Sequence, residues 1–214
     1  MAGCEICEKR RPKRYCLALR AEICPLCCGE EREQTIDCPL ECQYLREAHA
    51  REKPNELDPE QLPYRDVEIT EEFLAQNGPL VSEAGRLVAE AGLGMPGTAD
   101  KDVLEALDAM IRTLKTLESG VIYETRPANP YAANVYERVR AGIEEFRKKW
   151  FEETGMHSFR DRDVMGALIF LRRLGDLYQN GRKRGRAFLA KLRGAFGRAP
   201  QSETRATRPT IIRP

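Results

Sequence analysis

The sequence predicts a mainly α-helical protein that begins with a small cysteine-rich module. All eight cysteines lie between Cys4 and Cys42, and none occurs in the rest of the 214-residue chain. After Thr70, apolar residues recur at helical spacing and no strand pattern of any length appears. We therefore expect a zinc-binding module over residues 1–50, a linker over 51–69, an antiparallel bundle of four to five helices over 70–197, and a disordered basic tail over 198–214.

The spacing of the cysteines is typical of zinc ligands. Two C-x2-C pairs supply turn-mounted thiolates, which is the geometry that a tetrahedral zinc site uses. A structural zinc ion takes four ligands, so eight cysteines and one nearby histidine predict two ions. The candidate ligands are Cys4, Cys7, Cys16, Cys24, Cys27, Cys28, Cys38, Cys42 and His49.

The order of the cysteines suggests how these ligands divide. Adjacent residues point in different directions, so Cys27 and Cys28 are expected to serve different ions. The first ion would take the thiolates of Cys4, Cys7, Cys24 and Cys27. The second would take Cys16, Cys38 and Cys42, with either Cys28 or His49 as its fourth ligand. A short helix expected over Tyr44 to Ala50 carries His49, which is equally a candidate for a plain surface residue.

Other uses of the cysteines are open at this point. An iron–sulfur cluster is the main alternative, because Cys24-x2-Cys27-Cys28 is crowded enough to hold one. A disulfide framework is disfavoured, because the charged N-terminal stretch lacks the apolar segment of an export signal. A redox C-x2-C pair is disfavoured as well, because no βαβ pattern surrounds it. Zinc in a cytoplasmic protein is the expected answer.

The same residues resemble cross-braced zinc fingers of the HIT and MYND kind. Those fingers also string C-x2-C pairs together and end with C-x3-C followed by a histidine on a helix, as Cys38, Cys42 and His49 do here. The resemblance covers Cys4 to His49 only. Because such fingers mostly act in protein–protein contacts, it implies a protein partner.

The first helices of the predicted bundle are marked by their ends. Thr70 followed by two glutamates predicts a helix start, and Asn77-Gly78-Pro79 interrupts or restarts that helix. The loop over residues 92–97 precedes a helix that begins near Ala99 and stops at Ser119-Gly120.

The later helices carry equally clear signals. Asn129-Pro130 predicts a capped start for a helix that runs to about Glu153 and ends at Gly155. Ser158-x-x-Asp161 resembles a capping box for the next helix, which Asn180-Gly181 terminates. A shorter helix then holds Phe188 to Phe196.

A basic loop between the last two helices is the second candidate site. Four cations, interspersed with Gly181 and Gly185, precede a helix N-terminus, where guanidinium groups, free N–H groups and the helix dipole can bind phosphate. From residue 181 to the C-terminus there are ten Lys and Arg residues against one acid, so this loop and the basic tail predict possible contact with nucleic acid. The alternatives are a solvated loop, or one that docks on the acidic segment 54–100. The four candidate contacts are Arg182, Lys183, Arg184 and Arg186.

The functional prediction is a zinc-binding adaptor without catalytic activity. A net charge of only +1 gives no global field toward nucleic acid or membrane. The longest apolar run, Val164 to Leu171, is far short of the roughly 20 residues that span a bilayer. No nucleophile, phosphate-binding or dinucleotide-binding motif occurs. The alternative function is a metal- or redox-responsive regulator that uses an iron–sulfur cluster or reactive thiolates.

Overall fold

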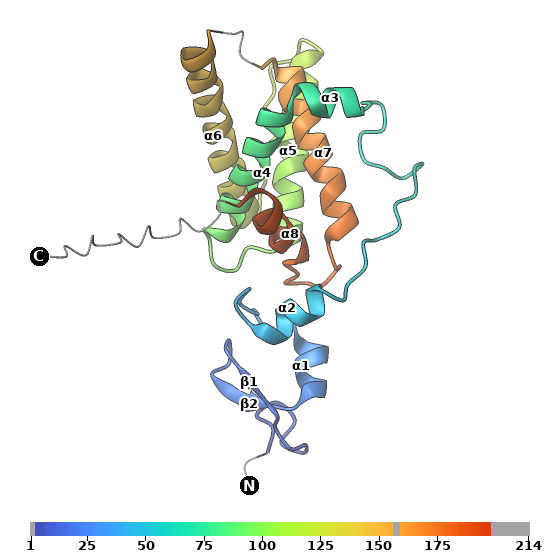
Figure 1. The fold of residues 1–214 in the computed structure, drawn as a ribbon, viewed down its shortest axis with the longest axis vertical. Coiled ribbons are helices and arrows are strands. Elements are labelled where there is room, and N and C mark those ends of the chain that lie inside the picture. Colours follow the sequence, from blue (N-terminus) through green and yellow to red (C-terminus); the bar gives the residue numbers. More distant parts are fainter. Residues whose placement is uncertain (1–2, 156–158, 198–214) are drawn as a thin grey trace, which may run out of the picture.

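The computed structural model describes residues 3–155 and 159–197, and this part of the chain contains eight helices and one two-stranded sheet. Figure 1 shows a cysteine-rich module at one end of the molecule and a group of longer helices above it. The prediction of a mainly helical protein is confirmed, and the longer helices are compatible with the predicted helical bundle.

The module is built from a small hairpin and two short helices. Strands β1 (Arg14–Cys16) and β2 (Ala21–Ile23) pair antiparallel, with Arg14 opposite Ile23. Helix α1 covers Pro25–Glu31, and α2 covers Gln43–His49, where a short helix was predicted. The sequence did not predict the hairpin or α1, because strands of three residues are too short to show a periodic pattern.

The bundle helices begin and end close to their predicted positions. The Thr70 hydroxyl accepts a hydrogen bond from the Phe73 N–H (3.0 Å), and Gly155 ends its helix with φ of 65°. Ser158 of the proposed capping box lies outside the described residues; the Asp163 carboxylate accepts from the Arg160 N–H (2.8 Å) at that helix start. The helices are α3 (Glu71–Gln76), α4 (Gly78–Leu93), α5 (Asp100–Glu118), α6 (Pro130–Thr154), α7 (Asp161–Tyr178) and α8 (Ala187–Phe196).

One apolar core holds these helices together. Helix α5 packs on α6 and α7, while α4 packs on α6, α7 and α8. Leu80, Leu107, Leu168 and Phe188, each from a different helix, are completely buried in it. Burying a side chain of this size contributes about 1.5–3 kcal/mol, so the bundle derives its stability from this core.

The segment expected as a linker is irregular but bound to the bundle. The Asn55 amide donates to the carbonyls of Asp176 and Gln179 (2.8 Å each). The Arg173 guanidinium donates to the carbonyls of Tyr64 and Val67 (2.9 Å each). These bonds fix the connection between module and bundle along α7.

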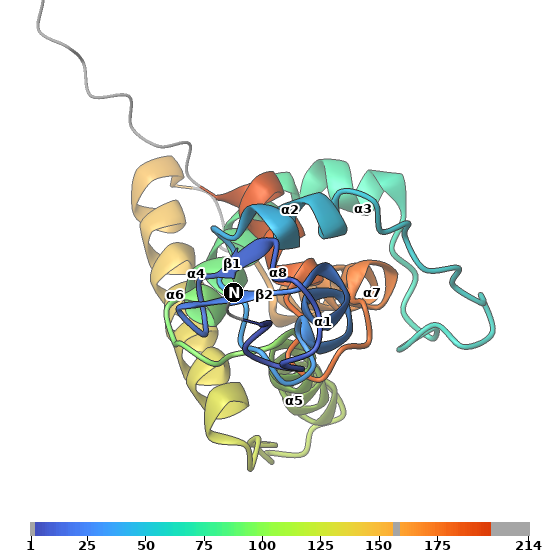
Figure 2. The same cartoon turned by 90° about the horizontal axis from the view of Figure 1, so that it is seen from below.

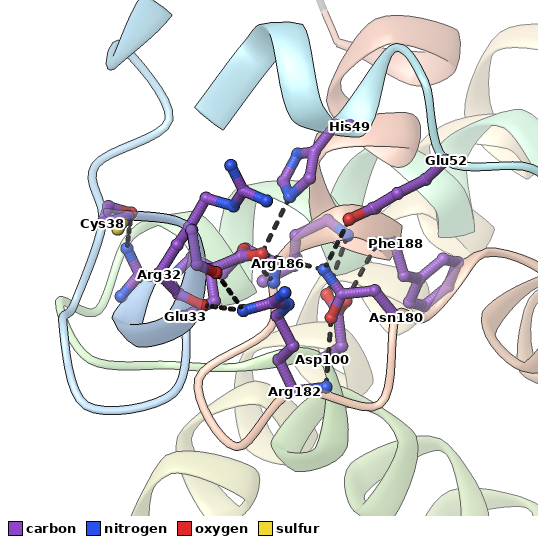
Figure 3. Close-up of polar contacts among 12 residues, drawn as sticks. Arg32, Glu33, Cys38, His49, Glu52, Asp100, Asn180, Arg182, Arg186 and Phe188 are labelled. Atoms are coloured by element: carbon purple, nitrogen blue, oxygen red, sulfur yellow. Dashed lines mark hydrogen bonds and ion pairs between the residues drawn. The ribbon is translucent and has the colours of Figure 1, made fainter. Parts of the chain in front are cut away.

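A buried carboxylate joins the module to the bundle. Glu33 follows α1 and is completely buried, with a left-handed backbone (φ 56°). Its carboxylate contacts His49 Nε2 (3.0 Å) from the module and accepts from the Asn180 amide and the Arg186 N–H (2.8 Å each) from the bundle. Figure 3 shows these groups pointing toward one another. We call Glu33, His49, Asn180 and Arg186 the Glu33 network.

A second buried carboxylate lies beside this network. Asp100, the first residue of α5, accepts hydrogen bonds from the N–H groups of Phe188 (2.9 Å) and Leu189 (3.0 Å) in the first turn of α8. Its own N–H donates to the Gly185 carbonyl (2.8 Å). An acidic side chain of the bundle thus accepts from two of the free N–H groups at the start of α8.

We predict that Glu33→Ala lowers the free energy of unfolding of the protein by about 3–5 kcal/mol, because it leaves buried donors without an acceptor. Urea denaturation measures the loss. Glu47→Ala, which truncates an exposed glutamate of α2, is the matched control and should change stability by less than about 0.5 kcal/mol. A loss below about 1 kcal/mol for Glu33→Ala would contradict the role of the network.

We predict a pH-dependent stability from Asp100. Burial and the nearby Glu33 charge together raise the pKa of its carboxyl to about 7, against the lowering effect of the N–H groups of Leu189 and Phe188. An unfolded aspartate has a pKa of about 3.9. The folded state therefore holds an extra proton between these values, and the free energy of unfolding falls as the pH rises toward 7. The fall is at most about 1.4 kcal/mol per pH unit.

The carboxyl carbon-13 shift of Asp100 should titrate with a midpoint near pH 7. Asp100→Asn should flatten the pH dependence of stability between about pH 4 and pH 7, the window set by the unfolded and folded pKa values. A midpoint below pH 5 in the wild-type protein would show that the N–H groups outweigh burial.

Candidate metal centre

Four cysteines come together at the far end of the module. Their sulfur atoms all lie within 4.8 Å of one another, and they come from two separate turns of the chain. Three of these residues are buried and the fourth is half-buried. These are the four residues predicted for the first ion, namely Cys4, Cys7, Cys24 and Cys27.

The first turn is shaped to hold two thiolates. The Glu8 N–H donates to the Cys4 carbonyl (2.7 Å), and Glu8 itself adopts a left-handed conformation (φ 55°). This turns the N–H groups of Lys9 and Arg10 toward the Cys7 sulfur, and they lower the pKa of that thiol. Backbone donors thus favour the thiolate, which is the form that binds metal.

The second turn coincides with the start of α1. Cys24 is the N-cap residue, Pro25 occupies the first turn, and the Cys27 N–H donates to the Cys24 sulfur (3.4 Å). The Cys24 N–H in turn donates to the Cys4 sulfur (3.1 Å), which ties the two turns together.

Within this group of four thiols, the pKa values of Cys4 and Cys27 are shifted in opposite directions. Burial raises the pKa of Cys4, but N–H groups of Cys7, Cys24 and Ile6 outweigh it and lower that pKa to about 6. Burial and contacts with the neighbouring thiols raise the pKa of Cys27 to about 12. Four negative charges cannot gather here without a compensating cation, so the donor set fits a divalent ion that binds thiolates, such as zinc.

The other four cysteines lie nearer to the bundle. The side chains of Cys16, Cys28, Cys38 and Cys42 line one small cavity of the module. Among the described residues, their sulfurs are not gathered as closely as those of the first group. The Arg14 guanidinium lies 3.3 Å from the Cys28 sulfur. Burial and the nearby charges of Cys16, Glu33 and Cys42 raise the pKa of Cys38 to about 11, against a lowering bond from the Glu33 N–H.

His49, the ninth predicted ligand, lies beside carboxylates at the junction between module and bundle. Its Nε2 contacts the Glu33 carboxylate, and it is grouped with Glu33 and Glu52, which all offer ligand atoms within 4.8 Å of one another. The Glu33 oxygens already accept from Asn180 and Arg186, so this second group serves the junction between module and bundle.

The predicted basic loop divides into two half-buried and two exposed cations. Arg182 donates to the carbonyls of Gly29 (3.3 Å) and Arg32 (2.5 Å). Arg186 pairs with Asp37 (2.7 Å) and donates to the Thr98 carbonyl (2.9 Å).

The exposed pair of this loop consists of Lys183 and Arg184, whose side chains reach solvent. The Arg184 N–H donates to the Glu33 carbonyl (2.7 Å). The loop therefore binds the module through its backbone and two of its four cationic side chains.

The sequence did not single out Glu33, Asn180 or Asp100. Glu33 belongs to a polar stretch without periodicity, and Asn180 was recognised only as a helix terminator. Their importance comes from contacts between residues far apart in the chain, and a single sequence does not record these contacts.

No protein-family model, curated protein or solved structure matches the chain. Among the described residues, no helix is long and apolar enough to cross a membrane.

We predict that replacing any one of Cys4, Cys7, Cys24 or Cys27 by serine removes one and the same ion, because a structural site needs all four ligands. Serine substitutions at Cys16, Cys28, Cys38 or Cys42 should leave that ion in place, which makes them the matched controls. Elemental analysis gives the metal-to-chain ratio of each variant. Eight variants that all lose the same metal would show a single indivisible cluster.

Proposed function

We propose that this protein is a zinc-binding adaptor without catalytic activity. The observation that carries the proposal is the closed set of four cysteine sulfurs, whose thiolates accept hydrogen bonds from the surrounding backbone. Four protein ligands complete a tetrahedral site and leave no position for a catalytic water, so the ion has a structural role.

A second zinc ion is part of the proposal. The shared cavity of Cys16, Cys28, Cys38 and Cys42 supports it, because it brings the four remaining cysteine side chains to one place in the module. The contact between His49 and Glu33 supports Cys28 over His49 as the fourth ligand.

The module offers a surface for a protein partner. It carries five large apolar side chains that are 36% to 52% exposed, on the N-terminal turn, the hairpin and the start of α1. Exposed apolar groups gathered on one small module favour a protein interface. These side chains are Ile6, Tyr15, Leu17, Leu19 and Leu26. Contact with nucleic acid is a weaker candidate, supported by the exposed Lys183 and Arg184.

A redox- or metal-responsive regulator is the second candidate function. All eight cysteines are free thiols, and Cys7 is half-buried rather than buried. A partly accessible thiol of lowered pKa is the kind that oxidants attack, and Cys7 fits this description.

Metal content and colour separate the two functions. We expect the untagged protein, purified under reducing conditions, to be colourless and to contain two zinc ions per chain. Visible absorption together with iron would overturn the zinc assignment in favour of an iron–sulfur protein. Zinc release by mild oxidation that reducing agent reverses would favour the regulator.

The adaptor role has a separate test. Leu17→Ser with Leu26→Ser should abolish cross-linking to the partner while zinc content is unchanged, because both side chains are exposed. Ile122→Ser is the matched control, since it removes a more exposed apolar group (95%) from the bundle. Equal capture by all variants would show that the module surface is not the interface.

A further inference from the structure

The geometry points to a binding site for a small phosphate-bearing molecule between α2 and α8. A cavity of about 250 Å³ lies there. Figures 1 and 2 both place α2 next to α8, at the junction between module and bundle. The cavity is separate from both groups of cysteines, because none of the eight cysteines lines it.

Cations from both sides of the junction line this cavity. Arg46 and Lys53 come from α2 and the residues after it, and Lys191 and Arg193 come from α8. Glu52 is the one acidic residue in the lining, and its carboxylate already accepts from the Asn180 amide (3.4 Å). Four cations facing one carboxylate give the cavity a positive potential.

Most of these cations have no carboxylate partner. Arg193 lies 3.3 Å from Glu41, but both side chains are largely exposed, so this ion pair contributes little. Within the described residues, Arg46, Lys53 and Lys191 form no ion pair. Arg86 of α4, by contrast, is paired with two glutamates of its own helix. The cations at the junction are therefore available to an external anion.

The remaining lining suits a compact ligand with an apolar part. Leu40, Ala187 and Ala190 provide apolar walls, and the Tyr178 ring provides a flat one. Lys191 Nζ lies 5.3 Å from the centre of that ring, where the ring attracts its charge. The volume corresponds to roughly eight water molecules at about 30 Å³ each, which is below the usual range for drug-sized ligands.

Phosphate is the anion that this set of donors fits best. A guanidinium forms two parallel hydrogen bonds to a phosphate, and lysines add charge without a fixed geometry. A phosphate monoester with a small ring or short carbon chain would place its charge among the four cations and its apolar part against Tyr178. Because the two walls belong to module and bundle, this ligand would stabilise their docked arrangement.

The test is an amide NMR titration of the zinc-loaded full chain with phenyl phosphate at constant ionic strength. We expect saturable shifts confined to residues of α2, α8 and the end of α7, with inorganic phosphate competing for the same site. Arg46→Gln combined with Lys191→Gln should raise the Kd at least about tenfold, because two charge-assisted contacts are lost. Both residues are exposed, so the variant should fold.

The matched control is Lys183→Gln combined with Arg184→Gln, which removes the same charge from exposed positions outside the cavity. Its Kd should change less than about twofold, since only screened long-range charge is removed. The proposal is overturned by an absence of saturable binding or by an equal loss in both double variants. It is also overturned if a single-stranded oligonucleotide binds here and phenyl phosphate does not.

Discussion

The burial of the Glu33 carboxylate determines how the two parts of this protein fit together. An ionised carboxylate costs several kcal/mol to remove from water unless hydrogen-bond donors surround it. Here the donors come from both parts: His49 belongs to the module, while Asn180 and Arg186 belong to the bundle. Neither part alone satisfies the charge. The docked arrangement is therefore the one in which Glu33 can be both buried and ionised, and its pKa, which burial raises, is lowered overall by His49 and Asn180.

The backbone of the same residue connects this junction to the cysteines. Its left-handed conformation directs the Glu33 N–H to the Cys38 sulfur, while its carbonyl accepts from Arg184. A strained conformation of this kind persists where the surrounding contacts enforce it. Cys38 is therefore supported by the same residue that makes the docking contact. The first group, Cys4, Cys7, Cys24 and Cys27, is held by its own turns and does not depend on the bundle in this way.

Local signals in the sequence account for what was predicted correctly. Helix ends at Thr70, Pro130 and Gly155 depend on hydrogen bonds within one turn, so a short stretch of sequence identifies them. The grouping of the first four cysteines follows from two C-x2-C turns for the same reason. The hairpin is too short to show a period, and the contact of His49 with Glu33 belongs to a network whose members lie up to 153 residues apart. Contacts between residues so far apart in the sequence can be identified only in the folded chain.

The basic loop attracts anionic groups as predicted, but these groups are carboxylates of the same chain rather than the phosphates of a nucleic acid. Glycines, arginines and a helix N-terminus do gather anionic groups at residues 181–189, as the sequence suggests. Those groups belong to the chain itself: Asp100 accepts from the first turn of α8, and Glu33 accepts from Arg186. An internal carboxylate is always present, so an external phosphate must displace it or bind elsewhere. Among the described residues that line the cavity between α2 and α8, Arg46, Lys53 and Lys191 form no ion pair with an internal acid. The distribution of internal acids, rather than the density of basic residues, therefore decides where this protein can receive an anion.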